Sequence, residues 1–212
     1  MRLITKILHI IIWLVLRPFL KVFTDFQISY PDNFSFKTPV IVVANHMGLM
    51  DPFLVGVSFP LFSKIHPFSF MTADSWINRS ILGIFVKLLG GFPTYYGQGL
   101  EISLKKPQEI IKNNGSIVIF PQGKRIWNIS ASQGKIGAAV LALKTRTSII
   151  PCRIIDTYPN SVIKIFLRKR KFKIIIGQPF SLTEKFGKKN IYTKNEYIQA
   201  TKIIMQKIKE LS

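Results

Sequence analysis

The segment TPVIVVAN at residues 38–45 contains a continuous run of apolar, mostly β-branched residues. Such a run is typical of a strand that is buried on both faces, because a strand with one solvated face alternates apolar and polar residues. Parallel sheets cover both of their faces with the helices that connect their strands. The segment therefore predicts a mostly parallel sheet inside an α/β fold.

The rest of the chain shows the same pattern. We expect further strands at residues 66–72, 116–120, 148–154, 162–167 and 171–180, and helices at about 52–62, 75–91, 100–113, 137–145 and 194–211. Strands that alternate with helices predict a mixed, mostly parallel sheet flanked by helices, with antiparallel pairing open for the last two strands. The length of 212 residues favours one α/β domain, which we place at residues 29–212 after an N-terminal helical segment at 1–28.

The N-terminal segment has a basic start, an apolar run at 7–16, and then the cations Arg17 and Lys21. This run is too short to span a bilayer unaided, since spanning takes about 20 apolar residues. No small-residue cleavage site of a signal peptide follows it. We predict an uncleaved helix that lies in the membrane interface, with Trp13 near the headgroups. A buried amphipathic core helix is the alternative.

The composition points to an anionic partner. The chain has 30 Lys and Arg against 10 Asp and Glu, a net charge of +20. The hydrophobic content of 48%, with 17 Phe, favours a membrane surface over nucleic acid, and no RNA-binding motif or DNA-recognition helix is recognisable. A single cysteine, Cys152, excludes an internal disulfide and a cysteine-built zinc site. We predict neither a metal nor a cofactor.

His46 and Asp51 lie five positions apart, directly after the first predicted strand, in a chain with only three histidines. The loop PQGKR follows the strand at 116–120 in the same way. Ligands of open α/β sheets bind beyond the carboxyl ends of the strands, so the two loops are expected to share one crevice. Asp51 also precedes Pro52, which is an ordinary helix start with Asp as the N-cap. The two roles are compatible if each carboxylate oxygen serves one of them.

Four blocks, NHMGLMD, GGFPTYYG, FPQGKR and IIPCRI, resemble in order and spacing the lysophospholipid and glycerol-phosphate acyltransferase family over roughly residues 38–180. The resemblance implies that His46 is the general base and Asp51 its partner. The substrate-binding positions that it implies are Asn45, Tyr96, Gln122, Gly123, Lys124 and Arg125. The chain departs from the family pattern at three of them: Tyr96 replaces an arginine that helps to bind the acceptor phosphate, Gln122 replaces glutamate and Lys124 replaces threonine.

Imidazole suits the removal of a hydroxyl proton, because its unperturbed pKa of about 6.5 lies near working pH. Asp51 would fix the tautomer of His46 and stabilise the imidazolium. No serine nucleophile motif is present, and Cys152 lies inside an apolar run, so we expect direct acyl transfer within a ternary complex.

The resemblance thus implies a membrane-associated O-acyltransferase, peripheral or monotopic, with its active site on the cytoplasmic side. It would move a fatty acyl group from acyl-CoA or acyl carrier protein to a lysophospholipid such as 1-acylglycerol-3-phosphate. One alternative is a non-catalytic lipid-binding relative, which the changes at Gln122 and Tyr96 favour. Nucleic-acid binding, suggested by charge alone, is the other.

The basic turn at residues 168–171, RKRK, is expected to be solvated. Two other roles stay open for it. It would attract anionic headgroups at about 1 kcal/mol per cation near a membrane, or it would dock an acidic acyl carrier protein.

Overall fold

The computed structural model describes residues 2–73, 77–78, 80–95, 97–128, 133–158, 161 and 163–212. It contains a seven-stranded sheet in the order β1-β7-β6-β2-β5-β3-β4. All strand pairs are parallel except β6 with β7, which confirms the predicted mixed, mostly parallel α/β fold. The strands are β1 (Asp25–Ser29), β2 (Val40–Ala44), β3 (Phe68–Ala73), β4 (Gly91–Thr94), β5 (Ser116–Ile119), β6 (Ser148–Asp156) and β7 (Lys171–Ile176).

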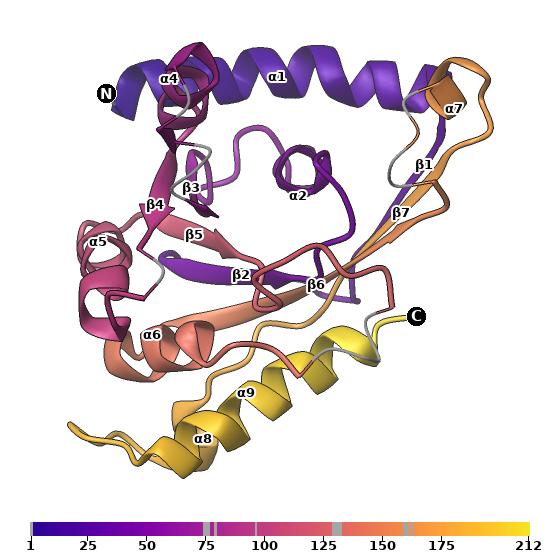
Figure 1. Ribbon diagram of the computed structural model, residues 1–212. Coiled ribbons are helices and arrows are strands. Elements are labelled where there is room, and N and C mark those ends of the chain that lie inside the picture. The colour runs from indigo at the N-terminus through magenta and orange to yellow at the C-terminus, as the bar shows by residue number, and fades with distance from the viewer. Residues whose placement is uncertain are drawn as a thin grey trace.

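Helices cover both faces of the sheet (Figure 1). α1 and α2 lie over one face, with α2 between α1 and the sheet, and α5, α6 and α9 cover the other. The helices are α1 (Arg2–Phe23), α2 (Asp51–Ser58), α4 (Ser80–Leu88), α5 (Leu100–Lys112), α6 (Gly137–Thr145), α7 (Ile163–Phe166), α8 (Thr183–Phe186) and α9 (Lys194–Lys209).

The central strand β2 is buried on both faces, as its composition predicted. Ile41 and Val43 belong to the core beneath α5, α6 and α9. Val40, Val42 and Ala44 belong to the core beneath α1 and α2. This alternation places β2 between two hydrophobic layers. The position of β2 in turn fixes where the loop after Ala44 begins.

The strand predicted at 162–167 is wrong. Residues Ile163–Phe166 form the short helix α7, and the sheet position beside β7 is taken by β1, a segment that we had not identified as a strand. β1 pairs with β7 in parallel, from Asp25 opposite Lys171 to Ser29 opposite Ile175. Strand propensity describes fitness for a half-buried pleated surface, so the β-branched residues of Ile163–Phe166 do not by themselves make this segment a strand.

α1 packs along the domain with one face and exposes the other. Leu20 is fully buried, Trp13 Nε1 donates a hydrogen bond to the Phe59 carbonyl at 2.9 Å, and the ring of His9 bonds the Leu89 carbonyl at 2.9 Å. The exposed face carries Leu3, Ile4, Ile7, Ile11, Leu14, Val15 and Val22. By length and composition alone, Leu3–Phe23 is long enough to cross a membrane, a longer apolar helix than the predicted run at 7–16.

Candidate functional site

The loops after β2 and β5 meet at the carboxyl edge of the sheet, because these two strands are parallel neighbours. The Ile126 N–H donates to the His46 carbonyl at 2.8 Å, and the His46 N–H donates to Gln122 Oε1 at 2.5 Å. The expectation that the two loops share one site is therefore confirmed in the geometry of the backbone.

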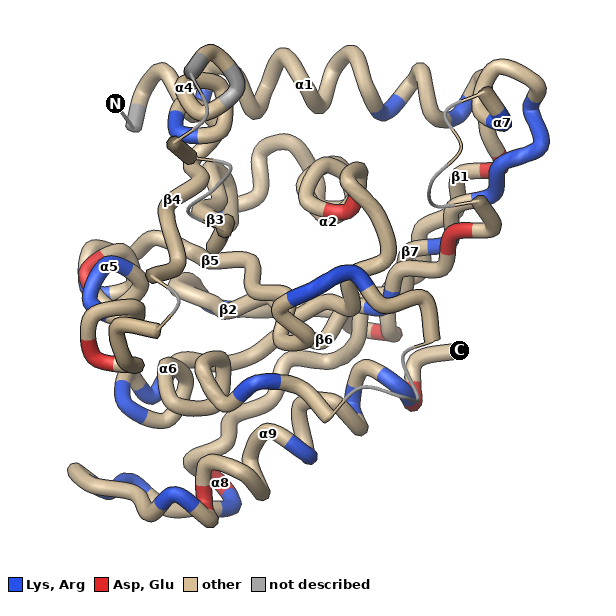
Figure 2. Tube along the Cα trace, viewed as in Figure 1, with Lys and Arg blue, Asp and Glu red and all other residues tan. Residues whose placement is uncertain are grey.

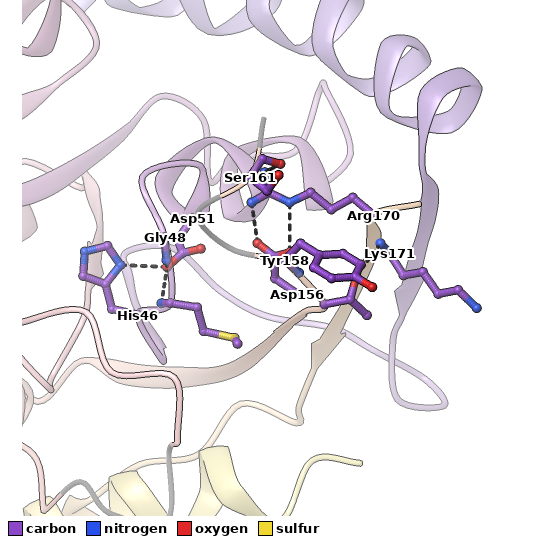
Figure 3. A network of polar contacts seen from close by, with 10 residues as sticks. His46, Gly48, Asp51, Asp156, Tyr158, Ser161, Arg170 and Lys171 are labelled. Carbon is purple, nitrogen blue, oxygen red and sulfur yellow. Dashed lines mark hydrogen bonds and ion pairs between the residues drawn. The ribbon is translucent and has the colours of Figure 1, made fainter. Parts of the chain in front are cut away.

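His46 and Asp51 form a hydrogen-bonded pair at this edge (Figure 3). His46 Nδ1 lies 2.7 Å from Asp51 Oδ2. The carboxylate is fully buried, whereas 22% of the imidazole is exposed. Because a carboxylate oxygen accepts, Nδ1 carries the proton of a neutral ring, and Nε2 keeps a lone pair that is free to accept one.

Asp51 holds the whole loop as well as the ring. Its Oδ2 also accepts hydrogen bonds from the backbone N–H groups of Met47, at 2.5 Å, and Gly48, at 2.9 Å. The interpretation of Asp51 as a helix N-cap is wrong, because α2 begins at Asp51, its N-cap is Met50, and no side chain caps it. The other oxygen, Oδ1, is buried without a hydrogen-bond partner among the described residues. One oxygen thus orients the imidazole and closes the turn.

Gln122 holds the backbone of His46. The residue is 4% exposed, and its Oε1 must be the accepting atom because the His46 N–H can only donate. A glutamate oxygen would accept the same hydrogen bond, so the change from glutamate to Gln122 leaves this connection intact and removes a negative charge.

Phe120, from the end of β5, stacks on the imidazole of His46 with ring centroids 4.5 Å apart and planes 25° apart. Sequence reasoning had identified Phe120 only as part of a motif. Its side chain limits the orientations open to the imidazole. The sequence signal that could have identified it is its position directly after β5, two residues before Gln122, in the loop that was expected to lie beside His46.

Asn45 connects β2 to β6. It is 2% exposed, its Nδ2 donates to the Ile154 carbonyl at 2.9 Å, and its Oδ1 accepts from the Ile154 N–H at 2.7 Å. The amide thus continues the β-ladder beyond the end of β2 by one pair of hydrogen bonds. It fixes the backbone directly before His46.

The remaining expected site residues lie on the loop after β5. Gly123 has φ +67°, and a Cβ there would lie 2.6 Å from Lys135 Cε, so the position favours glycine. Lys124 and Arg125 are exposed, and Figure 2 shows the loop as a basic stretch passing over β6. Tyr96 lies outside the described residues.

A mostly apolar cavity of about 480 Å³ opens beside this loop. It lies on the α5 and α6 side of the sheet, and Pro121 and Gly123, the neighbours of Gln122, form part of its wall. Its other walls include Met71, Tyr95, Leu104, Ile119, Lys135 and Ile136.

Cys152 is fully buried, and burial together with the nearby Asp51 raises the pKa of its thiol. Because the thiolate is the nucleophilic form, this residue is not suited to covalent catalysis. Within the described ranges, no group of three or more His, Cys, Asp or Glu side chains is arranged to hold a metal ion.

Comparison with known proteins adds the following similarities. Residues 25–155 match the sequence model of the family named Acyltransferase. The chain is 26% identical over 180 residues to the 1-acyl-sn-glycerol-3-phosphate acyltransferase of Bacillus subtilis (strain 168), covering 85% of this chain and 84% of that protein. It is 25% identical over 163 residues to the probable 1-acyl-sn-glycerol-3-phosphate acyltransferase of Mycoplasma pneumoniae, covering 71% and 60% of the two chains.

The fold also has a solved counterpart. The crystal structure of the 1-acyl-sn-glycerophosphate (LPA) acyltransferase from Thermotoga maritima superimposes with a TM-score of 0.62, at 21% identity, over 92% of this chain and 76% of that one. At this identity the likeness shows the fold.

Proposed function

Because the chain belongs to the acyltransferase family, whose model spans residues 25–155, we propose that it transfers a fatty acyl group from a thioester to a lysophospholipid hydroxyl. The donor would be acyl-CoA or an acyl carrier protein, and the acceptor a lipid such as 1-acylglycerol-3-phosphate. The names of the relatives from Bacillus and Mycoplasma support this acceptor. The observation that carries the proposal is the hydrogen-bonded pair of His46 and Asp51, in which the carboxylate is buried and the imidazole is partly exposed to solvent.

His46 acts as the general base in this proposal. Its Nε2 takes the proton of the acceptor hydroxyl while that oxygen attacks the thioester carbonyl. The tetrahedral intermediate then collapses, the C–S bond breaks, and the imidazolium returns the proton to the departing thiolate. Asp51 stabilises the imidazolium through the 2.7 Å hydrogen bond to Nδ1. No covalent acyl-enzyme forms.

Cations on the loop after β5 bind the acceptor phosphate. Lys124 and Arg125 are exposed beside the loop of His46, and an arginine can hold a phosphate through two parallel hydrogen bonds. We keep Tyr96 as a proposed acceptor contact. Asn45 and Gln122, whose oxygens are bonded to the backbone, serve as positioning residues rather than as substrate ligands.

The apolar cavity beside Gly123 accommodates an acyl chain in this proposal. Its volume of about 480 Å³ and its largely aliphatic walls fit a hydrocarbon chain better than a polar headgroup.

α1 places the enzyme at an anionic membrane surface, with the active site on the cytoplasmic side. The helix lies in the interface rather than across the bilayer, because the contacts of His9, Trp13 and Leu20 hold it along the domain. Its exposed apolar face then contacts the acyl region of one leaflet.

The test is transfer by the purified full chain, with acyl-CoA or acyl carrier protein as donor, a panel of lysophospholipid acceptors and mass detection of the products. His46→Ala is expected to lower transfer by about 10²- to 10⁴-fold, the usual contribution of a general base. His66→Gln, which removes a histidine two residues before the start of β3, serves as the matched control and retains transfer. Full transfer by His46→Ala overturns the assignment. Vesicle binding without transfer from any donor would support a non-catalytic relative instead.

A further inference from the structure

The helix α7 and the turn behind it combine exposed apolar and basic side chains. Ile163, Phe166 and Leu167 are 65%, 61% and 54% exposed. Arg168 and Lys169 follow directly and are exposed as well. No Asp or Glu occurs between residues 157 and 183. Three large apolar groups in solvent beside two exposed cations are typical of a segment that contacts an anionic lipid surface.

The turn is held rigidly by its one buried cation. Arg170 is 1% exposed, and its guanidinium donates to both carboxylate oxygens of Asp156, so the expectation that the whole basic turn is solvated is wrong for this residue. The Arg168 and Lys169 N–H groups bond the Ile165 and Lys164 carbonyls, each at 2.9 Å. Two cations are therefore presented outward on a fixed backbone.

α7 packs against the carboxyl-terminal end of α1 through aromatic rings. The ring of Phe166 lies 6.4 Å from that of Phe19 and 6.3 Å from that of Phe23, and the Arg168 guanidinium lies 5.9 Å from the Phe23 ring. Figure 1 shows α7 beside the carboxyl-terminal end of α1, and Figure 2 shows basic residues on both segments there. α1 itself contains no Asp or Glu.

We propose that Ile163–Lys169 forms a second membrane contact beside α1, in which Arg168 and Lys169 bind anionic phospholipid headgroups while Ile163 and Leu167 insert into the interface. The proposal rests on the membrane location proposed for α1 and adds a contact that lies about 140 residues further along the chain. The exposed apolar side chains beside the two cations favour a bilayer over an acidic acyl carrier protein. A carrier protein would bind the cations and leave these apolar side chains in water.

The first experiment measures binding of the full chain to vesicles that contain phosphatidylglycerol or only phosphatidylcholine. In the double variant Arg168→Asn and Lys169→Gln, asparagine suits the positive φ of 53° at position 168. Its dissociation constant on anionic vesicles is expected to rise about 25-fold, roughly fivefold per cation, and to stay unchanged on neutral ones. The variant Ile163→Ser and Leu167→Ser is expected to weaken binding about tenfold or more on both.

The matched controls lie at the far end of the molecule, around α8 (Figure 1). Lys185→Gln with Lys188→Gln removes the same charge from exposed positions, and Ile191→Ser removes an apolar side chain that is 85% exposed. Both controls are expected to bind within about twofold of the original chain, since charges beyond about 10 Å from the bilayer are screened by salt.

A second measurement does not depend on whether the charge and serine variants described above fold. A polarity-sensitive fluorophore is attached at Leu167→Cys or at Ile191→Cys, and the buried Cys152, whose thiol pKa is raised, stays unlabelled. A blue shift on anionic vesicles is expected at position 167 and not at 191. No shift at 167 while the chain binds vesicles overturns the inference, and so does a cation variant that loses only transfer from acyl carrier protein. Failure of the unaltered chain to bind vesicles refutes the proposed membrane location instead.

Discussion

Two buried carboxylates within one network are used in opposite ways (Figure 3). Asp51 gathers three N–H donors on one oxygen, and its side-chain partner is an imidazole that is 22% exposed. Asp156 divides its bonds between two oxygens: Arg170 Nε donates to Oδ1 at 2.9 Å and Arg170 Nη2 to Oδ2 at 2.5 Å. Both partners of this second pair are sealed from solvent.

The difference lies in the basic partner. An arginine stays charged at any physiological pH, so the pair of Asp156 and Arg170 can only fix the chain at the end of β6. An imidazole, unlike a guanidinium, can take up and release a proton, and that of His46 is 22% exposed. Under the proposed function, a buried acid serves chemistry only where its basic partner is an imidazole open to solvent. Four measurements test that distinction.

The largest effect is expected from Asp51→Asn. An asparagine amide that donates to Nδ1 selects the wrong imidazole tautomer, so kcat/KM for acyl transfer falls by about 10²- to 10⁴-fold. Steady-state kinetics on protein with an unchanged circular dichroism spectrum measures the loss. A variant within threefold of the original activity would place Asp51 with Asp156 as a purely structural acid.

Breaking the sealed pair is expected to change stability and not chemistry. Arg170→Met leaves the buried Asp156 carboxylate without its partner and lowers the free energy of unfolding by about 3–5 kcal/mol. The double variant Asp156→Leu and Arg170→Met recovers most of that loss, because no uncompensated charge remains. Denaturant unfolding gives both values. Loss of kcat in the folded double variant contradicts the structural role.

His66 is a partly buried polar group whose ring nitrogens have no hydrogen-bond partner, and so no acid, among the described residues. Burial and the neighbouring His9 lower the pKa of His66 to about 4. The folded state then binds fewer protons than the unfolded chain between pH 6.5 and 4, so stability falls as the pH falls through that window, by at most about 3 kcal/mol. Thermal unfolding against pH measures this, and His66→Gln is expected to flatten the curve. An equally steep curve for that variant would assign the titration elsewhere.

The smallest effect is expected from Gln122→Glu, which restores the acid of the family pattern. The hydrogen bond to the His46 N–H is kept, but the added negative charge favours the imidazolium. The acid limb of the profile of kcat/KM against pH is expected to move up by about one unit, with little change in stability. Gln122→Ala, which removes the hydrogen bond as well, serves as the comparison. An unmoved limb in Gln122→Glu shows that position 122 does not affect the charge of His46.

Sequence patterns predicted those parts of the fold in which the determining residues are neighbours along the chain. The β-branched run of β2, the loops that follow β2 and β5, and the family resemblance are confirmed by the sheet and by the match over residues 25–155. The hydrogen bond between His46 and Asp51 joins residues only five positions apart, at the start of α2, so one short segment of sequence contains both partners. The catalytic and substrate roles of the site residues remain predictions.

The features that sequence reasoning missed depend on distant partners. β1 is a strand because β7 offers it an edge, and its alternating DFQIS sequence gives only a weak strand signal. Arg170 is buried because Asp156 lies opposite it, 14 residues earlier in the chain. The hydrogen bonds of Asn45 need β6 as a neighbour, 109 residues away. No short window of sequence around β1 or Asn45 contains its partner.

Thr24 is the single residue between α1 and β1. Its N–H and its hydroxyl both donate to the Leu20 carbonyl, at 2.9 and 2.6 Å, so the chain passes from helix to strand without slack. A catalytic domain on a flexible tether could approach the bilayer at many angles. With α1 in the interface as proposed, this junction allows one: the depth of the helix sets the height of His46 above the leaflet, and with it the distance that an acceptor headgroup must rise to react.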